Sequence, residues 1–159
     1  MDYKIVRKDA FEVIGKIYKI FYGDGKHNQR IAKLWEQCNF DGTTDKIIKL
    51  NSSEKLLGIC MDFEEVKQEF SYMIAIQDIN DVKVTEFEKR EIPSADWAIL
   101  ESVGPMPDAL INLWSKVFNE WYPETGFQHG NAPDIEVYYP GDPSAKDYKC
   151  EIWTPIVKM

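Results

Sequence analysis

Three stretches of the sequence decide the fold: PDALINLWSKVFNEWYP at residues 107–123, IEVYY at residues 135–139 and YKCEIWTPIV at residues 148–157. The first carries apolar side chains three and four residues apart, which is the spacing of one helix face. Pro107 suits the first helical turn, and Pro123 is expected to end the helix. The other two stretches alternate between apolar and polar side chains, which predicts strands. The apolar face of the predicted helix, Asp108 to Trp121, comprises Leu110, Leu113, Trp114, Val117, Phe118 and Trp121.

The same patterns recur toward the N-terminus. Apolar and β-branched runs predict further strands, and apolar residues at helical spacing from Ile31 to Cys38 predict a second helix. Each half of the chain therefore reads strand, helix, strand, strand. The further predicted strands cover residues 3–6, 11–21, 56–63, 70–79, 85–92 and 97–103.

The two halves also align weakly with each other. Leu34-Trp35 falls on Leu113-Trp114 at an offset of 79 residues, and the same offset places Tyr72 on Glu151. An internal duplication predicts an α+β fold of two strand-helix-strand-strand (SHS2-type) repeats related by a pseudo-two-fold axis. The antiparallel sheets of such a fold would carry the helices on one face and a ligand cleft on the other.

Length and composition indicate one globular domain. The chain has 159 residues, of which 44% are hydrophobic and 29% are charged, as in ordinary globular proteins. We expect a single domain at residues 1–159, built from pseudo-repeats at about residues 1–80 and 81–159. Cys38, Cys60 and Cys150 are widely spaced and lie in apolar contexts, which predicts reduced core thiols.

The charge balance excludes several classes of partner. A formal net charge of −8 repels phosphate backbones and anionic membrane surfaces, so we expect no direct nucleic-acid binding and no membrane association. The first residues already read as part of the domain, with neither a signal segment nor an attached helix-turn-helix, which favours a cytoplasmic protein. A protein partner stays possible, and no feature of the sequence fixes the oligomeric state.

Motifs for metal, phosphate or covalent chemistry are weak. His27 and His129 lie in polar loops without zinc-ligand spacing, and Gly23 to Lys26 reads as a turn instead of a phosphate loop. No GxSxG motif supports a serine nucleophile. We therefore expect no metal and no cofactor.

Several short motifs of the second half carry a resemblance to a known family. In chain order they are WAIL at 97–100, GP at 104–105, EWYP at 120–123, PDIEVY at 133–138 and CEIWTPI at 150–156. Together they resemble the GyrI-like effector-binding domain of AraC-type bacterial transcription activators. The first half matches the family less specifically, at residues 57–60 and 70–72. The resemblance implies the α+β fold and a cleft for a small organic ligand.

The resemblance also implies a choice of functions. Our leading hypothesis is a free-standing effector- or drug-binding protein that holds an amphipathic, cationic aromatic compound beside a buried glutamate, without catalysis. The first alternative is a hydrolase of strained, cyclopropane-type electrophiles that uses the same glutamate as general base. The second is a protein regulator like the gyrase inhibitors of this family, for which the acidic run from Asp62 to Glu69 would meet the partner.

Glu151 is the leading candidate for the ligand-binding carboxylate. Along the last strand, Cys150 and Ile152 fall on one face, while Glu151 and Trp153 fall on the other. A carboxylate in an apolar strand is costly to bury unless a cation or hydrogen-bond donors meet it. The family resemblance implies an acidic residue here that faces cationic drugs. A solvent-exposed or salt-bridged glutamate is the other interpretation.

The remaining candidates are polar or aromatic residues expected near Glu151. Tyr72 could donate a hydrogen bond to Glu151 or to a ligand, and in an enzyme it would serve as the proton donor. Glu136 could approach Glu151 through the last hairpin, although exposure at the surface is the favoured interpretation for it. Core packing is favoured for the tryptophans and Phe118 on the helix faces. The candidate aromatic ligand contacts are Trp97, Tyr138 and Trp153.

Overall fold

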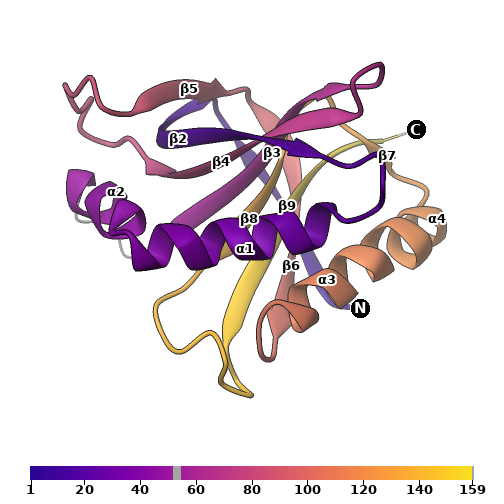
Figure 1. Cartoon of the computed structure of the whole chain (residues 1–159). Helices are drawn as coiled ribbons and strands as arrows, with labels where there is room; N and C mark the ends of the chain where they lie inside the picture. The colour runs from indigo at the N-terminus through magenta and orange to yellow at the C-terminus, as the bar shows by residue number, and fades with distance from the viewer. Residues whose placement is uncertain (52–54, 159) are drawn as a thin grey trace. The chain divides into compact units, whose positions relative to one another are not determined.

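The computed structural model describes residues 1–51 and 55–158 and divides into two compact units (Figure 1). Unit 1 comprises residues 1–10 and 93–159, and unit 2 comprises residues 11–92. Each unit is an antiparallel sheet with helices packed on one face, so the predicted α+β class is confirmed. The division differs from the halves predicted at 1–80 and 81–159, because one strand of each half pairs within the other unit.

Unit 2 holds four strands in the order β3-β4-β2-β5. The strands pair along predicted runs of alternating residues, and the one at Phe11–Phe21 has the predicted bounds. A second helix, which the sequence did not predict, follows the first after a short turn. The elements are β2 (Phe11–Phe21), α1 (His27–Phe40), α2 (Thr43–Asn51), β3 (Leu56–Glu64), β4 (Glu69–Gln77) and β5 (Glu88–Ile92).

The core of unit 2 lies between its sheet and its two helices. Because side chains alternate across a strand, the even-numbered residues of β2 and β4 face α1 and α2. Most of these positions are apolar, and the burial of the apolar ones supplies the main drive for folding this unit. The buried cluster contains Ile14, Ile20, Cys38, Ile47, Phe70, Tyr72, Ile74 and Ile76.

Unit 1 has the strand order β1-β6-β9-β8, and a short strand, β7, pairs with the end of β9. This order corresponds to that of unit 2, with β8 in the place of β3, β9 in that of β4, β6 in that of β2 and β1 in that of β5. Each unit thus contains the predicted strand-helix-strand-strand run. The elements are β1 (Tyr3–Lys8), β6 (Ala95–Val103), α3 (Asp108–Lys116), the π-helical turn η1 (Val117–Trp121), α4 (Tyr122–Thr125), β7 (Gln128–His129), β8 (Asp134–Tyr138) and β9 (Lys149–Val157).

The helical segments of unit 1 run on without a break through a π-helical turn (Figure 1). The prediction that Pro123 ends the helix is wrong, since α4 continues to Thr125. Pro123 lies in the first turn of α4, where a missing N–H is tolerated, and the wider π-helical turn before it leaves room for the ring. Gly126 ends the helix instead, with a φ of 76° that glycine adopts without strain.

The two faces of the unit 1 sheet carry different residues. Even-numbered positions of β6 and β9 pack under α3, η1 and α4, whereas odd-numbered positions such as Trp97 and Glu151 point away from them. The three cysteines of the chain are free, and Cys38 and Cys150 are buried as predicted. Within residues 1–51 and 55–158, no helix is long and apolar enough to cross a membrane. The helix-facing core contains Ala98, Leu100, Leu110, Val117, Trp121, Tyr148, Cys150, Ile152 and Ile156.

Candidate functional site

The most deeply buried carboxylate of unit 1 among the described residues belongs to Glu136, on the helix-facing side of β8. Its side-chain direction follows from pairing, because Glu136 lies opposite Ile152, a core residue packed under α3. Glu136 is only 6% exposed. Trp114 of α3 donates its indole N–H to Oε2 at 2.8 Å, and the Tyr138 hydroxyl donates to Oε1 at 2.8 Å. Each carboxylate oxygen thus has a neutral donor.

These two hydrogen bonds orient the carboxylate and do not neutralise its charge. An unpaired buried carboxylate would be costly, and hydrogen bonds from neutral donors offset part of that cost. Unlike a lysine or an arginine, an indole N–H and a phenol O–H add no formal positive charge. A carboxylate held by neutral donors has the chemistry to bind a cation.

An aromatic ladder extends from Trp114 along the helical segments. Trp114 stacks on Phe118 with ring centroids 5.6 Å apart and planes 12° apart, and Phe118 stacks on Tyr122 at 5.8 Å and 19°. The three residues are spaced four apart along α3, η1 and α4. Phe118 is 47% exposed, so the expectation that it packs in the core is wrong. The ladder presents a ring at the surface and ends at the tryptophan that bonds Glu136.

A second carboxylate, Asp134, lies at the start of β8 and joins a polar network. It accepts hydrogen bonds at one oxygen from His129 Nε2 and from the Thr154 hydroxyl, each at 2.9 Å. Thr154 and Tyr122 share a further hydrogen bond of 2.6 Å. The bond to Asp134 is the largest cause that raises the pKa of His129, and burial raises the pKa of Tyr122 to about 12.

Unit 2 has a similar indole bond with a different acceptor. Trp35 of α1 donates its indole N–H to the hydroxyl of Tyr72 at 2.8 Å. Tyr72 lies on the helix-facing side of β4 and is fully buried, and the two rings meet edge-on at 6.4 Å. The sequence-based expectation for Trp35 was core packing, and the structure adds this directed hydrogen bond to the packing.

Glu151 lies on the other face of the unit 1 sheet, away from the helices. It is only partly buried, and it accepts a hydrogen bond from the indole N–H of Trp153 at 3.1 Å. Trp153 packs at 6.2 Å from the ring of Trp97, which is fully buried, and carries the Lys8 ammonium 4.7 Å from its ring centroid. Burial and, secondarily, a hydrogen bond to Glu151 raise the pKa of Tyr139 to about 12.

The predicted site residues therefore occupy separate places. Glu136 and Tyr138 face the helices of unit 1, Glu151, Trp153 and Trp97 share the opposite face, and Tyr72 belongs to unit 2.

Three geometric expectations are wrong. Glu136 is buried instead of exposed, and it does not approach Glu151, because the register pairs Val137 with Glu151 and sends the two glutamates to opposite faces. Tyr72 is not the counterpart of Glu151 either, since one points toward the helices of its unit and the other points away.

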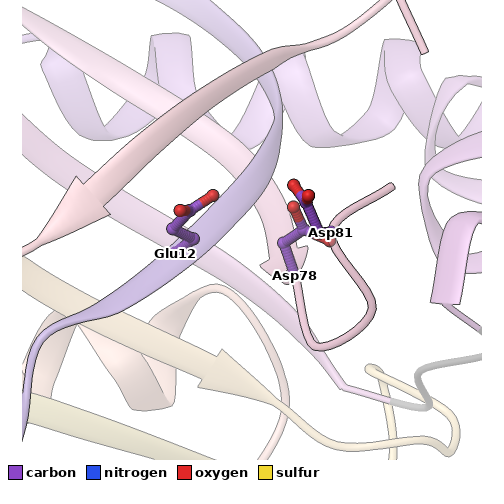
Figure 2. A group of neighbouring side chains, drawn as sticks. All are labelled: Glu12, Asp78 and Asp81. Carbon is purple, nitrogen blue, oxygen red and sulfur yellow. The ribbon is translucent and has the colours of Figure 1, made fainter. Parts of the chain in front are cut away.

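One acidic group in unit 2 has the spacing of metal ligands. Glu12 on β2 and Asp78 and Asp81 after β4 bring carboxylate oxygens within 4.8 Å of one another (Figure 2). The Lys89 ammonium lies 3.0 Å from Asp78 and 2.8 Å from Asp81, and Lys83 lies 2.8 Å from Asp81. Lysines thus supply the positive charge that these carboxylates need. A metal ion would have to displace Lys89.

Comparison with known proteins identifies the family. The family model for Cass2, described as integron-associated effector binding protein, matches residues 4–156. The chain belongs to this family. Cass2 is a GyrI-like family, so the resemblance drawn from the sequence motifs is confirmed. None of the curated proteins matches the chain.

Solved structures share the fold of this chain at low sequence identity. SAV2435 bound to tetraphenylphosphonium is 24% identical, with a TM-score of 0.85 over 99% of this chain and 94% of that one. A bacterial transcription regulation protein from Staphylococcus aureus MU50, described as putative, has 23% identity and a TM-score of 0.81 over 100% and 99% of the two chains. The integron cassette protein VCH_CASS2 from the mobile metagenome of Vibrio cholerae has 20% identity and a TM-score of 0.69 over 98% and 95%.

Sequence reasoning did not single out two parts of this region. Trp114 was assigned to the core because it lies on the apolar helix stripe. Helical spacing cannot distinguish an indole that only packs from one that also donates a hydrogen bond. Asp134 and His129 lacked a recognised motif. Their usable signal was the even spacing of Asp134, Glu136 and Tyr138, which places three polar side chains on one face of a short strand.

Proposed function

We propose that this chain is an effector-binding protein that holds an organic cation against the Glu136 carboxylate. The observation that carries the proposal is a carboxylate 6% exposed whose indole and phenol donors, Trp114 and Tyr138, are both neutral. A bound cation would interact with a charge that is poorly screened by water, which makes the attraction stronger than at the surface.

Each residue has a distinct role in this proposal. Glu136 supplies the charge, and Trp114 and Tyr138 fix the orientation of its two oxygens through one hydrogen bond each. The exposed part of the Phe118 ring also offers a contact to an aromatic or quaternary ligand, and such a contact adds roughly 0.5 to 2 kcal/mol. Together these features favour an amphipathic ligand with a delocalised or alkylated positive charge.

The family and the fold support the same class of ligand. The family description names an effector-binding protein, and the similar SAV2435 structure contains tetraphenylphosphonium, a cation with four phenyl rings. We extend that ligand chemistry to this chain as part of the proposal. Tetraphenylphosphonium is accordingly the first probe to test.

Isothermal titration with a cation and a neutral analogue tests the proposal. Tetraphenylphosphonium should bind the wild-type chain, and Glu136→Gln should weaken it at least about tenfold, because the amide keeps the volume and loses the charge. Triphenylphosphine oxide, which is neutral, should bind the two proteins within about twofold of each other. Glu120→Gln is the matched control, since Glu120 is exposed on η1. A Glu136 variant that binds the cation as tightly as wild type would refute the assignment.

Glu151, Trp153, Trp97 and Tyr72 stay predicted ligand contacts. The same titration with Glu151→Gln separates the two carboxylates: if Glu151 and not Glu136 holds the cation, only the Glu151 variant loses affinity. Tyr72→Phe removes a hydroxyl and no charge, so we expect a smaller loss from it.

Hydrolysis and partner inhibition stay predictions of the family resemblance. In the hydrolase, Glu151 is the predicted general base and Tyr72 the predicted proton donor. Incubation with cyclopropane-bearing electrophiles, followed by mass spectrometry for the water adduct, tests it, and Glu151→Gln should then stop turnover and keep binding. For the gyrase-inhibitor-like alternative, an excess of the chain should inhibit gyrase supercoiling, and charge reversal in Asp62 to Glu69 should relieve that inhibition.

A further inference from the structure

Two carboxylates lie in a row on the helix-facing side of β8. Glu136 bonds Trp114 of α3, and Asp134 bonds the hydroxyl of Thr154, which bonds Tyr122 of α4. The two residues are separated by one position along the strand, so their side chains leave the same face roughly 7 Å apart. Two positive charges on one small, rigid ligand can lie this far apart.

The aromatic ladder is connected by hydrogen bonds to both carboxylates. Trp114 donates a hydrogen bond to Glu136. Tyr122 shares a hydrogen bond with Thr154, which donates one to Asp134. Phe118 stacks between the two rings and is 47% exposed. The exposed Phe118 ring therefore lies between a ring bonded to Glu136 and a ring connected through Thr154 to Asp134.

His129 contacts the second carboxylate, Asp134. Its Nε2 lies 2.9 Å from Asp134, and the side chain is 39% exposed to solvent. The rings of Phe118 and Tyr122 pack against the imidazole, and β9 pairs beside it through Ile156. In the described part of the chain, Asp134 is the charged group that faces this ring, and Tyr122 is the other titratable one.

We propose that Asp134 is a second anionic position of the cation site, and that His129 switches its charge so that the site prefers organic dications when the imidazole is neutral. The inference rests on the proposed function of Glu136 and adds the ligand class and its regulation. With His129 protonated, the His129–Asp134 pair is neutral overall, and the site offers the charge of Glu136 alone. With His129 neutral, Asp134 adds a second negative charge.

The direction of the pH effect follows from this charge count. Because Asp134 raises the pKa of His129 above 6.5, the second charge becomes available only above the usual imidazole range. Preference for a dication should therefore rise as the pH increases through that raised pKa. By linkage, a bound dication should lower the pKa of His129, because it competes with the imidazolium for Asp134.

A matched pair of ligands tests the proposal on the full chain. The dication is p-xylylene-bis(trimethylammonium), whose charges lie roughly 7 Å apart, matching the spacing along the strand. The monocation is 4-methylbenzyltrimethylammonium, which keeps the ring and one charge. At constant ionic strength, the ratio of dication to monocation affinity should rise about tenfold from pH 6 to pH 9.

Two variants separate the switch from the charge. Asp134→Asn keeps an oxygen for Thr154 and removes the charge, so the affinity ratio should become low and independent of pH. His129→Gln keeps a donor toward Asp134 and removes the titration, so the ratio should become high and independent of pH. The matched controls are Asp147→Asn, at an exposed aspartate of unit 1, and His27→Gln, at the other histidine of the chain, and both should behave as wild type.

The outcomes distinguish this inference from the proposed function. If the monocation binds through Glu136 and the ratio of affinities stays flat with pH in wild type, the second anionic position is overturned and the cation site stands. If neither ligand binds at any pH, both proposals are overturned. Proton NMR titration of His129 gives an independent reading: a pKa that the dication lowers supports the switch, and one that it leaves unchanged overturns it.

Discussion

The indole bonds of Trp35 and Trp114 form a natural pair for comparison. Both tryptophans lie on the helix that follows the first strand of a strand-helix-strand-strand run, and both donate an indole N–H at 2.8 Å to a side chain of the sheet beneath. The acceptor is a phenol, Tyr72, in unit 2 and a carboxylate, Glu136, in unit 1. The helix of each unit thus positions an indole donor, and the acceptor on the sheet determines whether the pair carries a charge.

The helices of the two units differ as well. Unit 2 has α1 followed by the separate helix α2, whereas unit 1 has a continuous helical stretch with a π-helical turn and a stack of three rings. The charged acceptor and the exposed aromatic ladder occur in the same unit. Unit 1 therefore has the features that favour cation binding, and unit 2 has a neutral acceptor in their place. The predictions below test this difference between the units.

The largest effect on ligand affinity is expected from removing the charge of Glu136. Glu136→Gln should reduce tetraphenylphosphonium affinity at least about tenfold, which corresponds to about 1.4 kcal/mol. Glu136→Asp keeps the charge and should recover part of the loss, because the shorter side chain lies farther from both donors. Titration calorimetry at pH 7.5 measures both variants, and equal losses in the two would show that shape and not charge is recognised.

Removing the two indole donors should lower the free energy of unfolding by different amounts. Trp114→Phe takes a donor from a buried carboxylate and should lower the free energy of unfolding by about 2 to 4 kcal/mol, including lost packing. Trp35→Phe takes a donor from a neutral phenol and should cost about 1 kcal/mol less. Urea unfolding monitored by circular dichroism gives both values. A larger loss for Trp35→Phe would reverse the comparison.

The His129–Asp134 pair should make unit 1 sensitive to pH. Because the pKa of His129 is raised in the folded protein, its stabilising contribution is fully present below pH 6.5 and is lost as the pH rises through the raised value. Solvent exposure of the imidazole keeps this contribution small. Thermal unfolding of wild type and His129→Gln between pH 5 and pH 9 should show a difference that shrinks with increasing pH, and a difference that grows would contradict the sign.

The smallest effect is expected from the neutral acceptor. Tyr72→Phe removes the hydroxyl that accepts the Trp35 bond and leaves every charge in place. Affinity for tetraphenylphosphonium should change by less than about threefold, the size of one neutral hydrogen bond at its weaker end. A loss as large as that of Glu136→Gln would assign Tyr72 a direct role in cation binding and remove the asymmetry between the units.

Much of the fold could be predicted because alternation and helical period are local properties. The strand at Phe11–Phe21 and the helix that begins at Asp108 follow from them directly. Alternation also placed Glu151 and Trp153 correctly on one face of the last strand. For the short strand β8, alternation cannot tell which of the two faces the helices cover, and this information decides that Glu136 is buried.

The rest of the candidate site depends on contacts distant in sequence. The bond from Trp114 to Glu136 joins α3 to β8, and neither residue carries a local sign of its partner. Pro123 does not end the helix because the π-helical turn before it relieves the crowding that a proline usually causes there. Even-numbered positions of β4 and of β9 face the helices of their own units. An odd offset of 79 residues therefore pairs Tyr72, which faces the helices, with Glu151, which faces away from them.

The exchange of edge strands has a consequence for how the chain is made. Strand β1 is synthesised first, yet it pairs with β6, which begins at Ala95, and β6 in turn pairs with β9, near the C-terminal end of the sequence. Unit 2 is one uninterrupted segment, residues 11–92, inserted between the two parts of unit 1. During translation from the N-terminus, every strand of unit 2 has therefore been synthesised before β1 has a partner. The unit that holds Glu136 is therefore completed after unit 2 during translation.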